Sequence, residues 1–174
     1  MTINGIPAHP LIVHAAVVLV PLGALFAAAY GLWPSRRWQT RTPAVVLAVG
    51  AALSVQLAAM TGDQLKSRLH EDTALIHTHE QYAGYLQAAM WVLAGIMVIA
   101  WWALPHENPL PDKDHQSGIR ALAWPLTVLL PLAALTVLVL VVMTGDAGAR
   151  AVWGDAGRKS GTAAPLLRAS PIHG

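Results

Sequence analysis

The sequence predicts an all-α integral membrane protein with four transmembrane helices, arranged as two tandem helical hairpins. Hydrophobic residues make up 55% of the 174 residues and charged residues 11%, whereas an ordinary soluble domain has roughly 25% charged residues. Four uncharged stretches have about the 17–25 residues that a helix needs to cross a bilayer. The letters Met-Thr-Gly-Asp close two of these stretches, at 60–63 and at 143–146.

The four predicted spans are residues 11–33, 43–60, 82–104 and 121–143. Prolines within them are tolerated because neighbouring helices cover the carbonyls that proline leaves free. No Lys or Arg precedes the first apolar stretch, so it lacks the charged start of a cleavable signal peptide and is expected to remain as a helix. Residues 34–42 are expected to form a basic loop, 61–81 a charged and partly helical connection, and 105–118 a Pro- and Asp-rich loop.

The repeated motif predicts an internal duplication. A shift of 83 residues superposes one Met-Thr-Gly-Asp on the other, so the halves 5–75 and 76–154 are interpreted as copies of one hairpin with the same orientation, a parallel repeat. Coincidence in apolar, low-complexity sequence is the alternative. Together the halves form one predicted domain over residues 1–154, followed by a flexible C-terminal tail at 155–174.

Each half of the chain crosses the membrane twice and so returns to the face from which it started. One membrane face therefore carries the chain's start, the 61–81 connection, both motifs and the tail. That face carries six of the eight histidines: His9, His14, His70, His77, His79 and His173. Arg36, Arg37 and Arg41 lie in the short connection on the other face, which the positive-inside rule assigns to the cytoplasm. The prediction is a multi-pass protein of the bacterial inner (plasma) membrane with both termini outside.

The histidines are the candidate site. His9 precedes Pro10, which favours an extended backbone at His9. His14 lies about one turn inside the first span, where an ionisable side chain indicates function, and His79 starts the helical run that leads into the third. Two imidazoles at matching depth, His14 and His79, predict a bis-histidine haem b. The same region could instead bind zinc, copper or iron, or no cofactor; the candidate metal ligands are His9, His14, Asp63, His79 and Asp146.

Other interpretations of these residues stay open. Asp63 and Asp146 each follow a glycine that can end a helix, so each is also a candidate N-cap of a following helix. His14 could simply bond a backbone carbonyl. The absence of cysteine excludes disulfides and thiolate sites, and a net charge of +2 is too small to predict nucleic-acid binding. No nucleophile–base pair stands out, so an enzyme is not expected.

The stretches GIPAHPLIVHAAVVLVPL (5–22) and GDAGARAVWG (145–154) resemble a bacterial membrane family catalogued as domain of unknown function 2231. The resemblance covers residues 5–154 and implies a four-span inner-membrane protein. Some members look fused to Rieske-type or cytochrome c-type domains, which implies a place in extracytoplasmic electron transfer. One position departs: Asp146 stands where the family motif often reads G-H-S-G-A, and a carboxylate there suits zinc or copper better than haem.

The main functional hypothesis is an electron-transfer or metal- or haem-binding component on the outer face. The alternative is a cofactor-free accessory or assembly subunit of a respiratory membrane complex. A small transporter is disfavoured because no acidic residue lies deep in a predicted span. The expected partners are the lipid bilayer and other redox or respiratory membrane proteins.

Overall fold

The computed structural model describes residues 2–3, 6–69, 74–104 and 120–163. Its four long helices are α1 (Ala8–Leu32), α2 (Arg37–Leu69), α3 (Ala74–Ala103) and α4 (Arg120–Ala163). A 3-10 helix, η1 (Pro34–Arg36), joins α1 to α2, and a short antiparallel pair, β1 (Thr2–Ile3) and β2 (Ile6–Pro7), precedes α1. All four helices are long and apolar enough to cross a membrane, which confirms the predicted four-span, all-α architecture.

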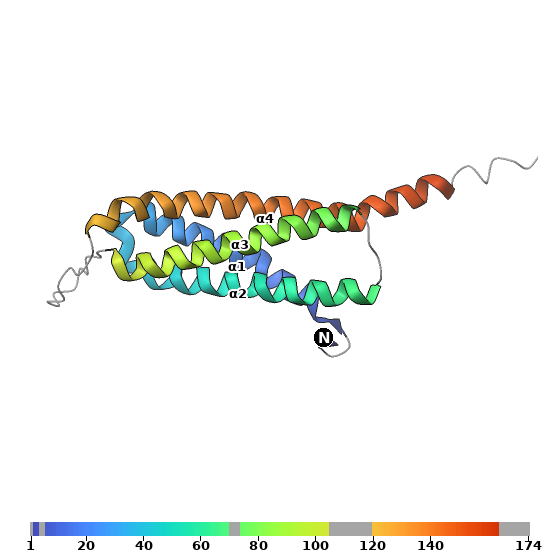
Figure 1. Cartoon of the computed structure of the whole chain (residues 1–174), viewed down its shortest axis with the longest axis horizontal. Coiled ribbons are helices and arrows are strands. Elements are labelled where there is room, and N and C mark those ends of the chain that lie inside the picture. Colours follow the sequence, from blue (N-terminus) through green and yellow to red (C-terminus); the bar gives the residue numbers. More distant parts are fainter. Residues whose placement is uncertain (1, 4–5, 70–73, 105–119, 164–174) are drawn as a thin grey trace, which may run out of the picture.

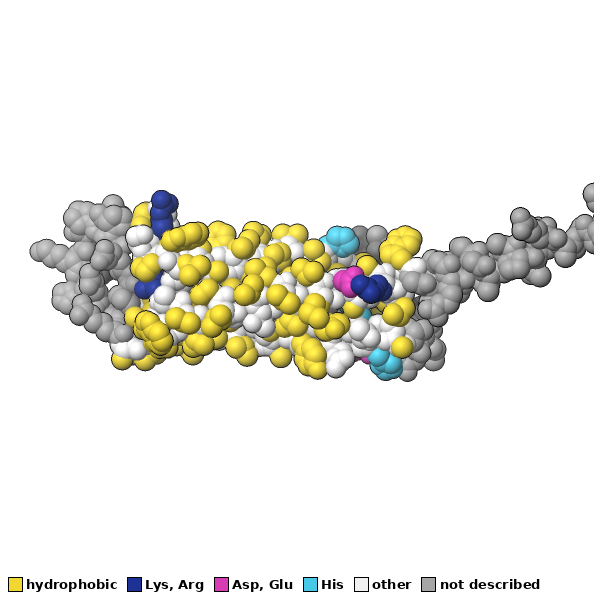
Figure 2. Space-filling model, turned by 90° about the horizontal axis from the view of Figure 1, so that it is seen from above, with side chains coloured by type: hydrophobic (Ala, Val, Ile, Leu, Met, Phe, Trp, Pro, Cys, Tyr) yellow, Lys and Arg dark blue, Asp and Glu magenta, His cyan; other side chains and the backbone are white. Residues whose placement is uncertain are grey.

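The helices form an up-and-down bundle, shown from the side in Figure 1. Each helix packs against the next along the chain, and α4 closes the bundle against α1, so α1 and α3 are diagonal. Figure 2 shows a wide hydrophobic band between charged side chains near the two ends. Large apolar side chains of the helices, such as Leu25 and Leu135, are exposed, as expected for helices that contact lipid.

The buried positions of the second hairpin match those of the first at two shifts, neither of which is the 83 residues of the repeated letters. Half of the buried core residues are alanine, which lets helix backbones approach closely in a membrane. A shift of 70 residues carries the buried α1 set onto a buried α3 set: Ala16, Val20, Ala24 and Ala27 onto Leu86, Met90, Ala94 and Met97. A shift of 86 residues does the same from α2 to α4: Ala44, Ala48 and Ala51 onto Leu130, Ala134 and Val137.

The helices continue beyond the predicted spans. Helix α2 runs through Gly62 and Asp63, and α4 runs through Gly145 and Asp146, so the expectation that these aspartates cap new helices is wrong. A glycine within a helix costs only about 1 kcal/mol relative to alanine, which is too little to end a helix packed against neighbours. The predicted basic loop is also shorter than expected, because α2 begins at Arg37.

At the end opposite the histidines, arginines bind the carbonyls at the C-termini of α1 and α3. Arg37 is buried and donates from Nε to Tyr30 O (3.1 Å) and from Nη2 to Gly31 O (3.4 Å) and Thr127 Oγ1 (2.9 Å). Arg41 donates from Nε to Trp101 O (3.1 Å) and lies over that indole ring. These carbonyls are among the last four of their helices, which lack intrahelical donors and carry partial negative charge.

Candidate histidine site

His9 lies in the first turn of α1, because the helix begins at Ala8. The expected extended backbone at this residue is therefore wrong. Pro10 is accommodated because the first four N–H groups of a helix have no intrahelical acceptor, so its missing N–H removes no bond. The start of α1 thus holds the half-buried His9 ring against α2.

The His9 ring is oriented by two acceptors on α2. Its Nδ1 lies 3.1 Å from Ala58 O and 3.1 Å from Thr61 Oγ1. A carbonyl oxygen can only accept, so Nδ1 carries the proton and donates it. The Thr61 hydroxyl donates its own proton to Leu57 O at 2.8 Å, which leaves its oxygen free to accept from His9. The neutral ring therefore has its lone pair on Nε2.

His79 repeats this arrangement between α3 and α4. Its Nδ1 lies 3.0 Å from Thr144 O, so the same reasoning places the proton on Nδ1 and the lone pair on Nε2. Within the part of the chain that the structure describes, no hydrogen bond is formed to Nε2 of either ring. Both histidines thus present an unprotonated Nε2 while the other nitrogen is held.

Each ring lies against a glycine four residues after the accepting carbonyl. A Cβ on Gly62 would come 3.2 Å from His9 Cε1, and a Cβ on Gly148 would come 3.1 Å from His79 Cε1 and Nδ1. The absent methyl group therefore makes room for each imidazole. The shift of 86 residues pairs Ala58 with Thr144 and Gly62 with Gly148, so the contacts lie about one helical turn from the register of the repeated letters.

The two histidines lie at the same end of the bundle, His9 at the start of α1 and His79 near the start of α3, and these two helices are diagonal. The site is not fully symmetric, because the shift that relates α2 to α4 places Ala147 where His9 has Thr61. His9 therefore has a hydroxyl acceptor in addition to the carbonyl, and His79 has the carbonyl alone among the described residues.

The other predicted ligands do not join this pair. His14 is exposed, and its Nδ1 lies 2.6 Å from Pro10 O of its own helix. Asp63 is exposed, and the exposed Asp146 pairs with Arg150 on the next turn (Oδ2 to Nε, 2.9 Å). Over the described ranges, no group of three histidine, aspartate or glutamate residues is placed to hold a metal ion. Of the predicted set, His9 and His79 are the two that lie at one end of the bundle with Nδ1 bonded to a neighbouring helix.

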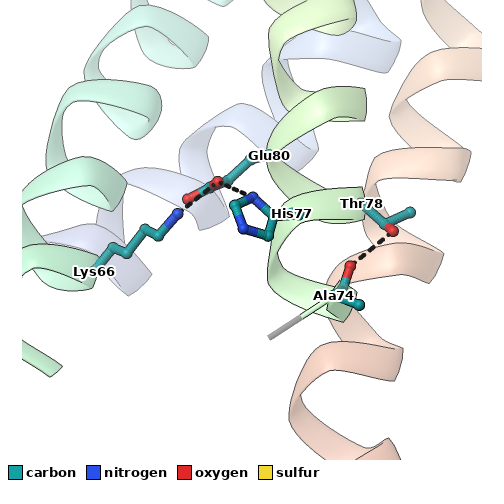
Figure 3. Close-up of polar contacts among 5 residues, drawn as sticks. All are labelled: Lys66, Ala74, His77, Thr78 and Glu80. Carbon is teal, nitrogen blue, oxygen red and sulfur yellow. Dashed lines mark hydrogen bonds and ion pairs between the residues drawn. The ribbon is translucent and has the colours of Figure 1, made fainter. Parts of the chain in front are cut away.

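Farther out on the same end, an ionic cluster joins α2 to α3. Figure 3 shows Glu80 between Lys66 and His77, with the lysine Nζ 2.9 Å and the His77 Nδ1 3.6 Å from Glu80 Oε2. All three side chains are at least partly exposed. Because exposed ion pairs contribute little to stability, this cluster marks the aqueous end of the α2–α3 contact more than it holds the bundle together.

The residues that sequence reasoning missed are the two glycines and the carbonyls of Ala58 and Thr144. Carbonyls carry no sequence signal. Gly62 was visible in a motif interpreted as ending a helix and Gly148 only in the closing stretch 145–154, but their contact with histidines depends on segments that are separated by at least 50 residues along the chain. The signal that could have found them is the helix-compatible sequence that follows each glycine, DQLKSRL after Gly62 and ARAVW after Gly148.

The chain matches the model of the family described as Predicted membrane protein (DUF2231) over residues 5–160. It therefore belongs to this family, as the resemblance in its opening and closing motifs indicated. No curated protein and no solved structure matches the chain.

Proposed function

We propose that this DUF2231 protein is a membrane electron-transfer component that binds haem b, or another transition-metal centre, through Nε2 of His9 and His79. The observation that carries the proposal is that Nδ1 of each ring donates to a backbone carbonyl. Metal-binding histidines typically donate their second ring nitrogen in this way, which fixes the tautomer and the ring orientation and makes the other nitrogen a better ligand.

The number of histidines favours haem b over zinc. Haem iron in a bis-histidine site takes two protein ligands, which is the number that the paired rings offer. A structural zinc ion takes four protein ligands and a catalytic one three, and no such group exists in the described part of the chain. When bound, a haem b would supply one-electron chemistry, while the carbonyls of Ala58 and Thr144 hold the two imidazoles in place.

The arginines support an extracytoplasmic site. Arg36, Arg37 and Arg41 cluster at the end of the bundle remote from His9 and His79, and short basic segments stay preferentially in the cytoplasm. The histidine end and both termini then face outward from the inner membrane. A redox partner of this protein would be a membrane or extracytoplasmic protein that reaches this face.

A cofactor-free accessory or assembly subunit is the second candidate. It is favoured by the fact that the same histidine bonds tie α1 to α2 and α3 to α4 without any metal. In this case His9 and His79 would be purely structural, and the lipid-facing surface of the bundle would contact a larger respiratory complex.

Purification in mild detergent from cells supplied with iron and a haem precursor tests the proposal. A reduced-minus-oxidised visible spectrum and elemental analysis are recorded on the same sample. We expect Soret and alpha bands with an iron content near one per chain. His9→Ala and His79→Ala should each lose both signals.

His14→Ala is the matched control, because it removes an exposed imidazole five residues from His9 on the same helix. It should keep the full spectrum. Haem loss in His14→Ala but not in His9→Ala would refute the assignment of the pair. A colourless, metal-free protein, even after incubation with haemin or copper, would support the accessory-subunit candidate.

A further inference from the structure

A polar cluster lies within the membrane-spanning part of the α2–α3 contact. Gln56 Oε1 accepts from Gln87 Nε2 at 2.7 Å and from Trp91 Nε1 at 3.2 Å. Gln87 lies eight residues beyond His79 along α3, which places it about 12 Å into the bundle from the level of the histidines. Both glutamines lie in helices long and apolar enough to cross a membrane, and hydrocarbon offers no hydrogen-bond partner to polar groups.

The Trp91 indole determines which carboxamide atoms of Gln56 and Gln87 are left without a hydrogen-bond partner. Trp91 Nε1–H can only donate, so Gln56 must turn its oxygen toward the indole. Gln87 must then present its NH2 group to the same oxygen. This arrangement leaves the Gln56 NH2 group and the Gln87 oxygen, and neither has a hydrogen-bond partner among the residues that the structure describes.

The Gln56 NH2 group and the Gln87 side-chain oxygen lie on the outer face of α2 and α3, where lipid tails cannot form hydrogen bonds to them. Both glutamines are partly exposed and Trp91 is 44% exposed. One helical turn before Gln87 along α3, Gly84 is exposed, and a Cβ added to it would meet nothing within 4 Å. Unpaired amide groups in hydrocarbon each cost several kcal/mol, and glycine lets a second helix backbone come close.

We propose that the α2–α3 face around Gln56, Gln87 and Gly84 docks a second copy of this chain. The leftover groups are one donor and one acceptor at the same depth, because the two glutamines bond to each other. A two-fold axis along the membrane normal would bring the Gln56 NH2 of each copy to the Gln87 oxygen of the other. The same patch then serves on both sides, as a two-fold interface requires.

This inference does not rest on the proposed cofactor. The glutamine cluster lies on the outside of α2 and α3, whereas His9 and His79 bridge neighbouring helices at the end of the bundle. A dimer could form with or without haem, so the two proposals fail separately.

Association is measured on the full chain in lipid nanodiscs or vesicles by single-molecule photobleaching or energy transfer over a range of dilution. We expect a dimer whose association constant falls about 10- to 1000-fold in Gln56→Leu or Gln87→Leu, because the change is present in both copies and removes two interhelical hydrogen bonds, each worth about 3- to 30-fold in a bilayer. Gln81→Leu is the matched control, because it makes the same chemical change on α3 where the side chain bonds Tyr85 of its own helix.

Cysteine cross-linking tests the interface in the glutamine-containing protein. The chain has no native cysteine, so Gly84→Cys introduces a single thiol at the proposed interface and Leu135→Cys one on the exposed side of α4. Oxidation should form a disulfide between two chains of Gly84→Cys and not between two chains of Leu135→Cys. A monomer at every dilution, a dimer that both glutamine variants leave unchanged, or cross-links in native membranes solely to a different protein would each overturn the proposal.

Discussion

Replacing Gly148 by alanine should displace the His79 ring, whereas the same change three residues earlier on α4 should be harmless. A Cβ at residue 148 would lie 3.1 Å from both Cε1 and Nδ1 of His79, closer than ordinary van der Waals contact. The ring must therefore move by a few tenths of an ångström, and Nδ1 now stands 3.0 Å from Thr144 O. That movement stretches the hydrogen bond that orients the ring.

The size of the effect follows from three contributions. Alanine stabilises a helix by about 1 kcal/mol relative to glycine. Against this, overpacking a tight contact costs about 1–3 kcal/mol, and loss of the hydrogen bond costs about 0.5–1.5 kcal/mol. Gly148→Ala should thus lower the free energy of unfolding by about 0.5–3.5 kcal/mol, whereas Gly145→Ala, whose Cβ meets nothing within 4 Å, should raise it by up to about 1 kcal/mol.

Reversible unfolding in mixed micelles with increasing SDS, followed by far-ultraviolet circular dichroism, measures both variants. Nitrogen-15 spectra of labelled histidine report the ring directly: in the unaltered protein the His79 proton should reside on Nδ1, and Gly148→Ala should change that signal. If the two alanine variants were equally stable, or if the unaltered ring carried its proton on Nε2, the contact of His79 with Gly148 and its hydrogen bond to Thr144 O would be refuted.

The remaining predictions concern the rest of the bundle. Arg37→Gln should lower the free energy of unfolding by about 2–4 kcal/mol, because it removes a charged donor that binds three acceptors, while the exposed Arg36→Gln should change it by less than about 0.5 kcal/mol; SDS titration compares them. Glu80→Gln should cost less than about 1 kcal/mol, and the cost should shrink further in high salt, as the same titration in low and high salt would show. Alkaline phosphatase fused after residue 174 should be active and green fluorescent protein fused there dark; the reverse result would place the arginine end outside.

Much of the fold could be predicted from local sequence. Low charge and long apolar stretches require helices in lipid, because a helix satisfies its own backbone polar groups. Helix ends were predicted less well, since glycine and aspartate at 62–63 resemble a boundary when considered alone. Packing against neighbouring helices outweighs that local preference, and α2 continues to Leu69.

The membrane face that carries the candidate site could be predicted from the sequence, but the pair of histidines that forms it could not. The two-span repeat placed the histidines at one end, but choosing His14 instead of His9 as the partner of His79 depended on the rotation of α1 and on where that helix begins. The decisive contacts are to backbone carbonyls of Ala58 and Thr144, which any residue would provide. The repeated letters also suggested a register about one turn away from the one that the contacts define.

Gly62 makes room for His9 and Gly148 makes room for His79. The two residues of each pair are therefore expected to change together in evolution. A descendant that keeps the imidazole at position 9 or 79 can place a side chain at 62 or 148 only by displacing that ring, whereas a descendant that has lost the imidazole can place any helix-forming residue there. Substitutions at 9 and 62 should therefore be correlated across the family, and so should those at 79 and 148. Whether the two pairs are lost singly or only together would then reveal whether natural selection acts on each helix contact alone or on both imidazoles as a unit.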